Sequence, residues 1–345
     1  MTVSTATGRQ QHTLPAPVIL ESGAVLPRVT VAYQTWGELS STRDNAVLVC
    51  HALTGSADVA DWWGALIGPD GALDPASDFI ICSNVLGSCY GTTGPGSPEW
   101  DAVFGARPDA AAVTVRDVVH VQRQLLDALG VRTLRLVIGG SMGGMQALEW
   151  ALLYPDVVES IAVLAAPAVH APWAVALSEV QRQAIFADPE WPHGRAAKGL
   201  ATARMMAMVS YRSARSFEVR FAAGRSDASQ PQVQSWLHRH GEKLVERLDA
   251  RTYVALTHVL DSHDVGRGRG GVQAALATMR QPALVVGIDT DVLYPPHEMK
   301  ALAAALPASE LFWLDSPHGH DAFLIEQDVV LRAVRDFRSR VGEHR

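Results

Sequence analysis

The feature that most constrains the fold of this chain is the pattern Gly139-x-Ser141-x-Gly143. An apolar, strand-like segment, Leu134–Ile138, runs into it, and Gln146–Leu153 follows with a helical pattern. This order predicts a strand, a sharp turn that carries the serine, and a helix. Side chains beside the serine would clash in so tight a turn, which explains its small neighbours. The turn would project the serine oxygen from the sheet edge, with the helix N-terminus facing any negative charge that develops there.

A pattern this short also occurs by chance in glycine-rich chains, where it marks only a tight strand–helix turn. Here both flanking elements are present, so we favour the interpretation of Ser141 as a nucleophile. A lone serine is a poor nucleophile and needs a base to take its proton and an acid to hold that base. In an elbow of this kind the acid and the histidine follow later strands, in that order.

Nearly continuous apolar runs recur along the chain, as expected for strands that are buried on both faces of a parallel sheet. An amphipathic helix is predicted over Val113–Leu129, capped by Thr114 with Asp117 as its capping-box partner. The start differs, because Val18–Leu26 and Arg28–Trp36 alternate like an antiparallel pair. The further predicted strands are Ala46–Cys50, Phe79–Leu86, Leu134–Ile138, Val158–Leu164, Ala283–Ile288 and Leu311–Leu314.

The pattern changes to mostly helical between Val169 and Gly271. Four helices are predicted there, over Ser178–Phe186, Arg195–Tyr211, Pro231–Arg247 and Thr252–Leu260. We therefore expect residues 1–168 and 272–345 to form a core domain and residues 169–271 to form a helical lid inserted into it. Alternating strands and helices, an elbow on a middle strand and this insertion together predict an α/β fold of the α/β-hydrolase type, with a mostly parallel central sheet.

Composition excludes several classes of protein. The 345 residues include 48% hydrophobic and 19% charged residues, as in a globular protein, and the net charge of −7 argues against nucleic acid as a partner. Three cysteines without a C-x-x-C pair indicate a reducing compartment and no structural zinc. The polar segment Met1–His12 is no secretory signal, and no run is long enough to span a membrane. We expect a cytoplasmic protein with a short frayed leader.

Two acids and two histidines compete to be the partners of Ser141. Asp289 and Asp291 follow the strand Ala283–Ile288, while His318 and His320 follow Leu311–Leu314. Both segments fall at the carboxyl edge of the predicted sheet, where this fold places acid and base. Any one of the four can be a solvated loop side chain. A serine, an acid and a histidine that each follow a strand in the required order are better explained as a catalytic triad.

Two backbone N–H groups should form the oxyanion hole. Met142 follows the nucleophile, and Leu53 lies in the loop after the strand Ala46–Cys50. His51 in the same loop is expected to hold the loop rather than to act as a second base.

Five segments together resemble the homoserine O-acetyltransferase family of methionine biosynthesis, over about Leu20 to Phe337. Within that resemblance the triad is Ser141, Asp291 and His320. The resemblance also implies that Arg204, Tyr211 and Asp321 bind the carboxylate and ammonium groups of the acceptor. The matching segments are Gly139–Gln146, His51–Gly55, Asn84–Gly87 with Gly91–Pro95, Asp291–Pro295 and Gly319–Leu324.

The resemblance implies that acetyl-CoA donates an acetyl group to Ser141 and that L-homoserine receives it, with ping-pong kinetics, no further cofactor and no metal. It also implies a homodimer through the lid. The sequence departs from the family at Gly87–Tyr90 and Gly96–Glu99, in loops that can shape the donor pocket. Alternatives are a succinyl donor, serine as acceptor, a plain esterase, and a non-catalytic binding protein on this fold.

Overall fold

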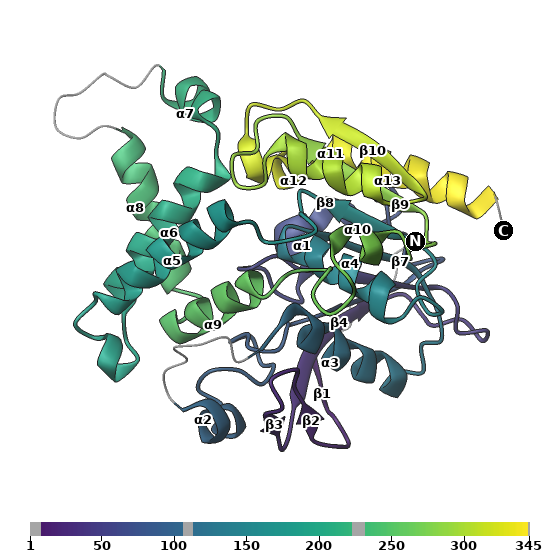
Figure 1. The fold of residues 1–345 in the computed structure, drawn as a ribbon, viewed down its shortest axis with the longest axis horizontal. Helices are drawn as coiled ribbons and strands as arrows, with labels where there is room; N and C mark the ends of the chain where they lie inside the picture. Colours follow the sequence, from purple (N-terminus) through teal and green to yellow (C-terminus); the bar gives the residue numbers. More distant parts are fainter. Residues whose placement is uncertain (1–7, 106–112, 223–231, 344–345) are drawn as a thin grey trace.

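The computed structural model describes residues 8–105, 113–222 and 232–343. At its centre lies a mixed sheet of eight strands (Figure 1). Its strand order is β1-β4-β6-β5-β7-β8-β9-β10; β1 and β4 pair antiparallel to their neighbours and the rest are parallel. The elbow strand β7 therefore lies in the middle of the sheet, as predicted. The strands are β1 Gln10–Thr13, β4 Thr30–Trp36, β5 Ala46–Cys50, β6 Phe79–Ser83, β7 Leu134–Gly140, β8 Ile161–Leu164, β9 Ala283–Ile288 and β10 Ser309–Leu314.

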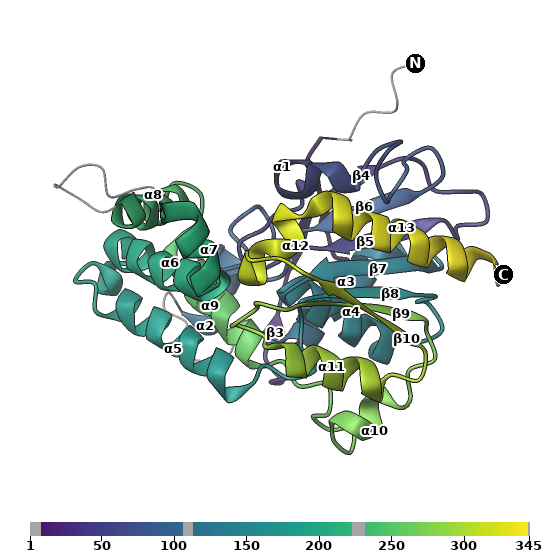
Figure 2. The same ribbon diagram turned by 90° about the horizontal axis from the view of Figure 1, so that it is seen from above.

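Both faces of this sheet are covered by helices (Figure 2). Alternate side chains of one strand enter different cores, since Leu48 packs in one apolar cluster and Val47 and Val49 pack in the other. This explains why the central strands read as unbroken apolar runs. On one face lie α3 Val115–Ala128, α4 Met142–Leu153 and α11 Pro296–Ala305, and on the other α1 Val59–Trp63, α12 Ala322–Ile325 and α13 Gln327–Glu343.

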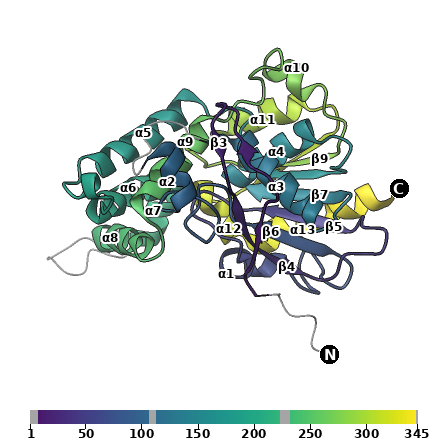
Figure 3. The same cartoon turned by 90° about the horizontal axis from the view of Figure 1, so that it is seen from below.

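The helical region between β8 and β9 lies beyond one end of the sheet (Figures 1 and 3). The two chain segments that connect it to the sheet pair with each other: the N–H of His170 donates to the carbonyl of His263 at 2.9 Å, and the N–H of Val265 to that of Ala168 at 3.1 Å. We call these paired segments, residues 167–170 and 261–265, the neck. The helices are α5 Pro172–Phe186, α6 Ala197–Tyr211, α7 Ala214–Phe221, α8 Gln232–Val245, α9 Ala250–Asp261 and, near the core, α10 Val272–Leu276.

The predicted capping box is confirmed, because Thr114 accepts from the N–H of Asp117 while Asp117 accepts from that of Thr114. Helix α7 was not predicted, and neither was α2, Pro98–Phe104. Pro231, the predicted start of α8, lies outside the described residues.

The expectation of a frayed leader up to His12 is wrong in its last part. Gln10–Thr13 forms β1 and pairs antiparallel with β4, while residues 1–7 lie outside the described part. The segment is polar because it is an edge strand with few buried side chains, so hydropathy does not reveal it. The predicted strand Arg28–Trp36 is confirmed as β4, Thr30–Trp36, but it pairs with β1 and β6 instead of with Val18–Leu26. The segment Val18–Leu26 is not one strand, because Val18–Ile19 (β2) and Val25–Leu26 (β3) form a short hairpin.

Cys50 and Cys82 are buried, as expected for small apolar residues of the strands, and both are free thiols, as is the partly buried Cys89. In the part of the chain that the structure describes, no helix is both long and apolar enough to cross a membrane.

Candidate active site

Ser141 occupies a strained turn between β7 and α4. Its φ of 55° and ψ of −125° lie in a region that L-residues rarely adopt, and its side chain is nearly buried. Close packing makes the strain possible: a Cβ built on Gly143 would lie 2.1 Å from the carbonyl oxygen of Cys50, and one on Gly139 would lie 2.4 Å from the backbone of Gly143. The elbow needs glycines because β5 and α4 approach through backbone atoms.

His320 and Asp291 form a short hydrogen bond. His320 Nδ1 lies 2.7 Å from Asp291 Oδ2, and both side chains are buried. The other carboxylate oxygen of Asp291 accepts from the N–H groups of Leu293, at 2.8 Å, and Tyr294, at 3.0 Å. Burial by itself would lower the pKa of His320, but the charge and hydrogen bond of Asp291 outweigh it and raise that pKa above its ordinary value. The carboxylate is thus fixed by backbone donors and in turn fixes the imidazole.

The competing acid and histidine have other partners. Asp289 accepts from the N–H of Ser316 at 3.0 Å and so ties the β9 loop to the β10 loop. The ring of His318 contacts Ser216 Oγ at 3.3 Å and lies 3.9 Å from Glu326. Of the two acids and two histidines that the residues alone left open, the structure joins Asp291 to His320.

Aromatic rings enclose the imidazole of His320 on several sides. Ring centroids of Tyr294, Tyr211 and Phe323 lie 5.2, 5.7 and 5.8 Å from that of His320. Phe323 also lies over the elbow, because a Cβ on Gly140 would meet its ring at 2.3 Å. Sequence reasoning missed Tyr294 and Phe323 as site residues; their signal was position, three residues after Asp291 and three after His320.

The loop after β5 is held against the elbow by His51 and Gln146. His51 Nε2 accepts from the N–H of Val85 at 3.1 Å, and its Nδ1 lies 2.8 Å from the carbonyl of Ala52. Burial lowers the pKa of His51 to about 4, so the ring is neutral and its role is structural, as expected. Gln146 Nε2 donates to the carbonyls of His51, at 3.2 Å, and Met142, at 3.1 Å.

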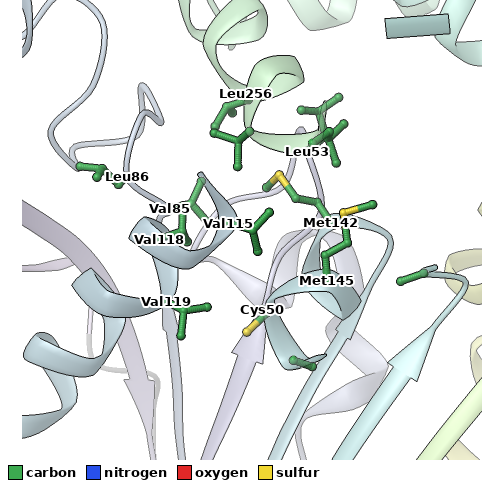
Figure 4. Packing of buried hydrophobic residues seen from close by; sticks show 14 of the residues in the cluster. Cys50, Leu53, Val85, Leu86, Val115, Val118, Val119, Met142, Met145 and Leu256 are labelled. Atoms are coloured by element: carbon green, nitrogen blue, oxygen red, sulfur yellow. The ribbon is translucent and has the colours of Figure 1, made fainter. Parts of the chain in front are cut away.

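Leu53 and Met142, the residues predicted for the oxyanion hole, are both buried in one apolar cluster, together with Leu256 of α9 (Figure 4). Met142 is the first residue of α4, so its N–H has no acceptor within the helix. This places a backbone donor directly after Ser141.

Arg204 and Tyr211 lie on one face of α6, with the Arg204 guanidinium 5.5 Å from the centre of the Tyr211 ring. Since Tyr211 contacts His320, this helix brings a cation to the candidate site. Asp321 forms an ion pair with Arg212, with Nε and Oδ2 3.1 Å apart. Arg212 is a further residue that sequence reasoning missed, and its signal was its place directly after Tyr211.

Metal-ligating side chains do not cluster in the described ranges, where no group of three His, Cys, Asp or Glu residues could hold an ion.

The chain matches the family described as alpha/beta hydrolase fold over residues 45–327. It therefore belongs to the α/β-hydrolases, a class in which the serine, the acid and the histidine occur in that order along the chain. Homoserine O-acetyltransferase of Trichormus variabilis is 52% identical to it over 344 residues, which cover 96% of this chain and 94% of that protein. The chain belongs to the homoserine O-acetyltransferase family.

Two solved structures with a similar fold belong to proteins that are named for different reactions. Homoserine O-acetyltransferase from Staphylococcus aureus is 29% identical with a TM-score of 0.81, covering 96% of this chain and 95% of its own. An acetylester hydrolase from Corynebacterium glutamicum is 25% identical with a TM-score of 0.86, covering 96% of each chain. The fold is thus shared by proteins named for transfer to an alcohol and for hydrolysis.

Proposed function

We propose that this chain transfers the acetyl group of acetyl-CoA to the hydroxyl of L-homoserine, a step of methionine biosynthesis, through an acyl-serine intermediate. The observation that carries the proposal is the hydrogen bond between Asp291 and His320, in a chain whose strained Ser141 elbow and 52% identical relative point to the same activity. Acetyl-CoA and homoserine are substrates in this scheme, and no further cofactor or metal is needed.

In the first half-reaction His320 Nε2 takes the hydroxyl proton of Ser141 while Oγ attacks the thioester carbonyl carbon. The carbonyl oxygen becomes an oxyanion, which the N–H groups of Leu53 and Met142 stabilise. The C–S bond then breaks, and His320 returns the proton to the CoA sulfur. The carboxylate of Asp291 stabilises the imidazolium that forms between these steps.

In the second half-reaction the homoserine hydroxyl replaces CoA. His320 removes its proton, the oxygen attacks the acyl carbon, and Ser141 leaves with the proton. Arg204 can hold the carboxylate of the acceptor in two parallel hydrogen bonds, beside the ring of Tyr211. The carboxylate of Asp321 accepts hydrogen bonds from the ammonium group of the acceptor and keeps its ion pair with Arg212.

The rival with an observation of its own is an acetylester hydrolase, because one such protein shares the fold at 25% identity. A hydrolase does not need to bind the carboxylate and the ammonium group of an amino acid, so Arg204 and Asp321 favour transfer. The decisive quantity is the ratio of acyl-enzyme discharge by homoserine to discharge by water.

The assembly we propose is a homodimer through the lid, in the cytoplasm. Lid helices α5, α6 and α7 carry exposed Val180, Val209 and Val219, each more than half exposed. Mass measured by light scattering on a sizing column tests this, and a monomer would refute it.

Mass spectrometry of the chain mixed with acetyl-CoA tests the whole scheme. We expect an acetyl mass on the peptide that bears Ser141, its loss on addition of homoserine with formation of O-acetylhomoserine, and no label on Ser141→Ala. Succinyl-CoA and serine, run in parallel, identify donor and acceptor. Absence of the acyl mass, or discharge by water as fast as by homoserine, contradicts the proposal.

A further inference from the structure

The loop that carries Asp291 is hydrogen-bonded to the first helix beyond the neck. Trp173 is the second residue of α5, and its indole Nε1 donates to the carbonyl of Val292, the residue after Asp291, at 2.7 Å. The proximity follows from the sheet, because α5 comes after β8, the Asp291 loop follows β9, and these two strands pair side by side. Tyr294 Oη, 3.2 Å from His170 Nδ1, ties the same loop to the neck.

The hydrogen bond from Trp173 falls on a peptide unit whose other end holds the carboxylate of Asp291. The carbonyl of Val292 and the N–H of Leu293 belong to one planar trans peptide, so they point in opposite directions. The carbonyl accepts from Trp173, while the N–H donates to Asp291 Oδ1 at 2.8 Å. Because the peptide plane is rigid, a donor that fixes the direction of the carbonyl also fixes the direction of the N–H.

The same connection continues to the imidazole of His320. The other carboxylate oxygen of Asp291 lies 2.7 Å from His320 Nδ1, so three hydrogen bonds and one peptide unit link Trp173 to His320. A donor at the carbonyl of an amide also polarises that amide and makes its N–H a better donor. Trp173 therefore acts on the carboxylate in two ways, through the orientation and through the strength of the hydrogen bond that the carboxylate accepts.

Burial does not explain the position of Trp173. The residue is 56% exposed, whereas Leu293 and Asp291 are 7% and 3% exposed. An indole with more than half of its surface in water contributes little to an apolar core, so the hydrogen bond to Val292 is what ties this side chain to the loop. Without Trp173, water would reach the carbonyl of Val292, but a mobile water molecule would not fix its direction.

We propose that Trp173 is a positioning residue for the catalytic acid: its indole N–H sets the peptide unit that orients Asp291, and Asp291 in turn orients His320. Because Trp173 stands on α5, the orientation of the acid depends on the position of that helix. This inference rests on the proposed function, since it assumes that Asp291 and His320 serve Ser141 as acid and base.

The first test measures the second-order rate at which a fluorophosphonate labels Ser141, because that reaction needs an activated serine but neither CoA nor homoserine. The wild type must label and Ser141→Ala must not. Trp173→Phe removes the N–H and keeps an aromatic ring, and it should label about twofold to tenfold more slowly, as for one lost hydrogen bond. In an Asp291→Asn background, Trp173→Phe should cause no further loss, because both changes act through the same side chain.

The second test is proton NMR, which reports on acid and base without any turnover. The Nδ1 proton of His320 lies in a short hydrogen bond to a carboxylate and should resonate far downfield. Trp173→Phe should move this resonance upfield and speed its exchange with solvent, because the carboxylate is less firmly held. Trp62→Phe is the matched control: Trp62 Nε1 also donates to a backbone carbonyl, that of Ser56, at 2.9 Å, and its loss should leave both readouts at their wild-type values.

Thermal unfolding shows that the variants fold. A labelling rate of Trp173→Phe equal to wild type, an unchanged His320 resonance, or an equal loss in the Asp291→Asn background overturns the positioning role. A wild type that does not label overturns the proposed function, and the His320 resonance then still decides whether Trp173 orients the acid.

Discussion

Replacing Asp291 by Asn should abolish most of the activity by changing which nitrogen of His320 carries the proton. One carboxylate oxygen of Asp291 accepts from two backbone N–H groups, at 2.8 and 3.0 Å, and the other lies 2.7 Å from His320 Nδ1. The amide oxygen of an Asn side chain has to stay with the two N–H donors. Its NH₂ group then faces Nδ1, which must become an acceptor, so the ring proton moves to Nε2 and blocks uptake of the Ser141 proton.

The size of the loss follows from the same contacts. Restoring the active tautomer requires the amide to flip, which leaves two buried N–H groups facing an NH₂ group. Each unsatisfied donor costs about 1–3 kcal/mol, so the active tautomer lies about 2–6 kcal/mol higher. At about 1.4 kcal/mol per tenfold, this is a loss of roughly 30-fold to 20,000-fold. Because the imidazolium also loses its carboxylate partner, we expect the upper half of that range, near the ~10⁴-fold loss known for the same change in a serine protease.

The assay follows release of the CoA thiol at saturating homoserine, and Asp289→Asn is the matched control. Asp289 lies in the same loop, but its carboxylate accepts from the N–H of Ser316 and is not bonded to His320, so the control should stay within about threefold of wild type. If Asp291→Asn kept more than a tenth of the activity, the tautomer argument would be wrong. Equal losses in both variants would point to a collapsed loop instead.

Three further outcomes are expected. Arg204→Ala should raise the KM for homoserine about tenfold or more and leave the rate of Ser141 acylation within twofold, as measured by separate half-reactions, because it removes a carboxylate partner only from the acceptor step. Gly143→Ala should lower the free energy of unfolding in denaturant by about 3 kcal/mol or more, since its Cβ would lie 2.1 Å from a backbone oxygen of β5; Gly342→Ala, with open space around it, is the control. Glu298→Gln should raise the melting temperature at pH 8 but not at pH 5. Burial and a nearby carboxylate raise the pKa of Glu298 from 4.5 to about 7, so the folded state favours the protonated form and loses stability as pH rises through this window.

The central sheet could be predicted because its inner strands are nearly continuous apolar runs that end at turn signals. Every buried strand of the sheet was found within a few residues of its observed bounds, and so was α3 with its cap. The edge strand β1 was missed for the opposite reason, since its polar side chains carry no hydrophobic signal.

Position in the sequence reduced the candidates for the acid and the histidine to two each. Only the structure, or the resemblance to a known family, chose between them. Asp289 and Asp291 stand two residues apart, and their roles depend on which one receives the backbone N–H groups of the next turn. Sequence spacing does not determine that choice. The contacts of Tyr294 with His170, and of Arg212 with Asp321, join segments more than 100 residues apart and have no local pattern.

The neck also separates the residues proposed to form and break bonds from two of those proposed to bind the acceptor. Ala168 and Val265 are hydrogen-bonded neighbours, and the strands that precede and follow them, β8 and β9, lie side by side in the sheet. An insertion that leaves and returns at one point imposes no shift on the strands it interrupts. Ser141, Asp291 and His320 stand on the sheet, whereas Arg204 and Tyr211 stand within the insertion. Replacement of the helical region between β8 and β9 beyond Trp173 is therefore expected to change which acceptor is bound, while Ser141, Asp291 and His320 keep their positions.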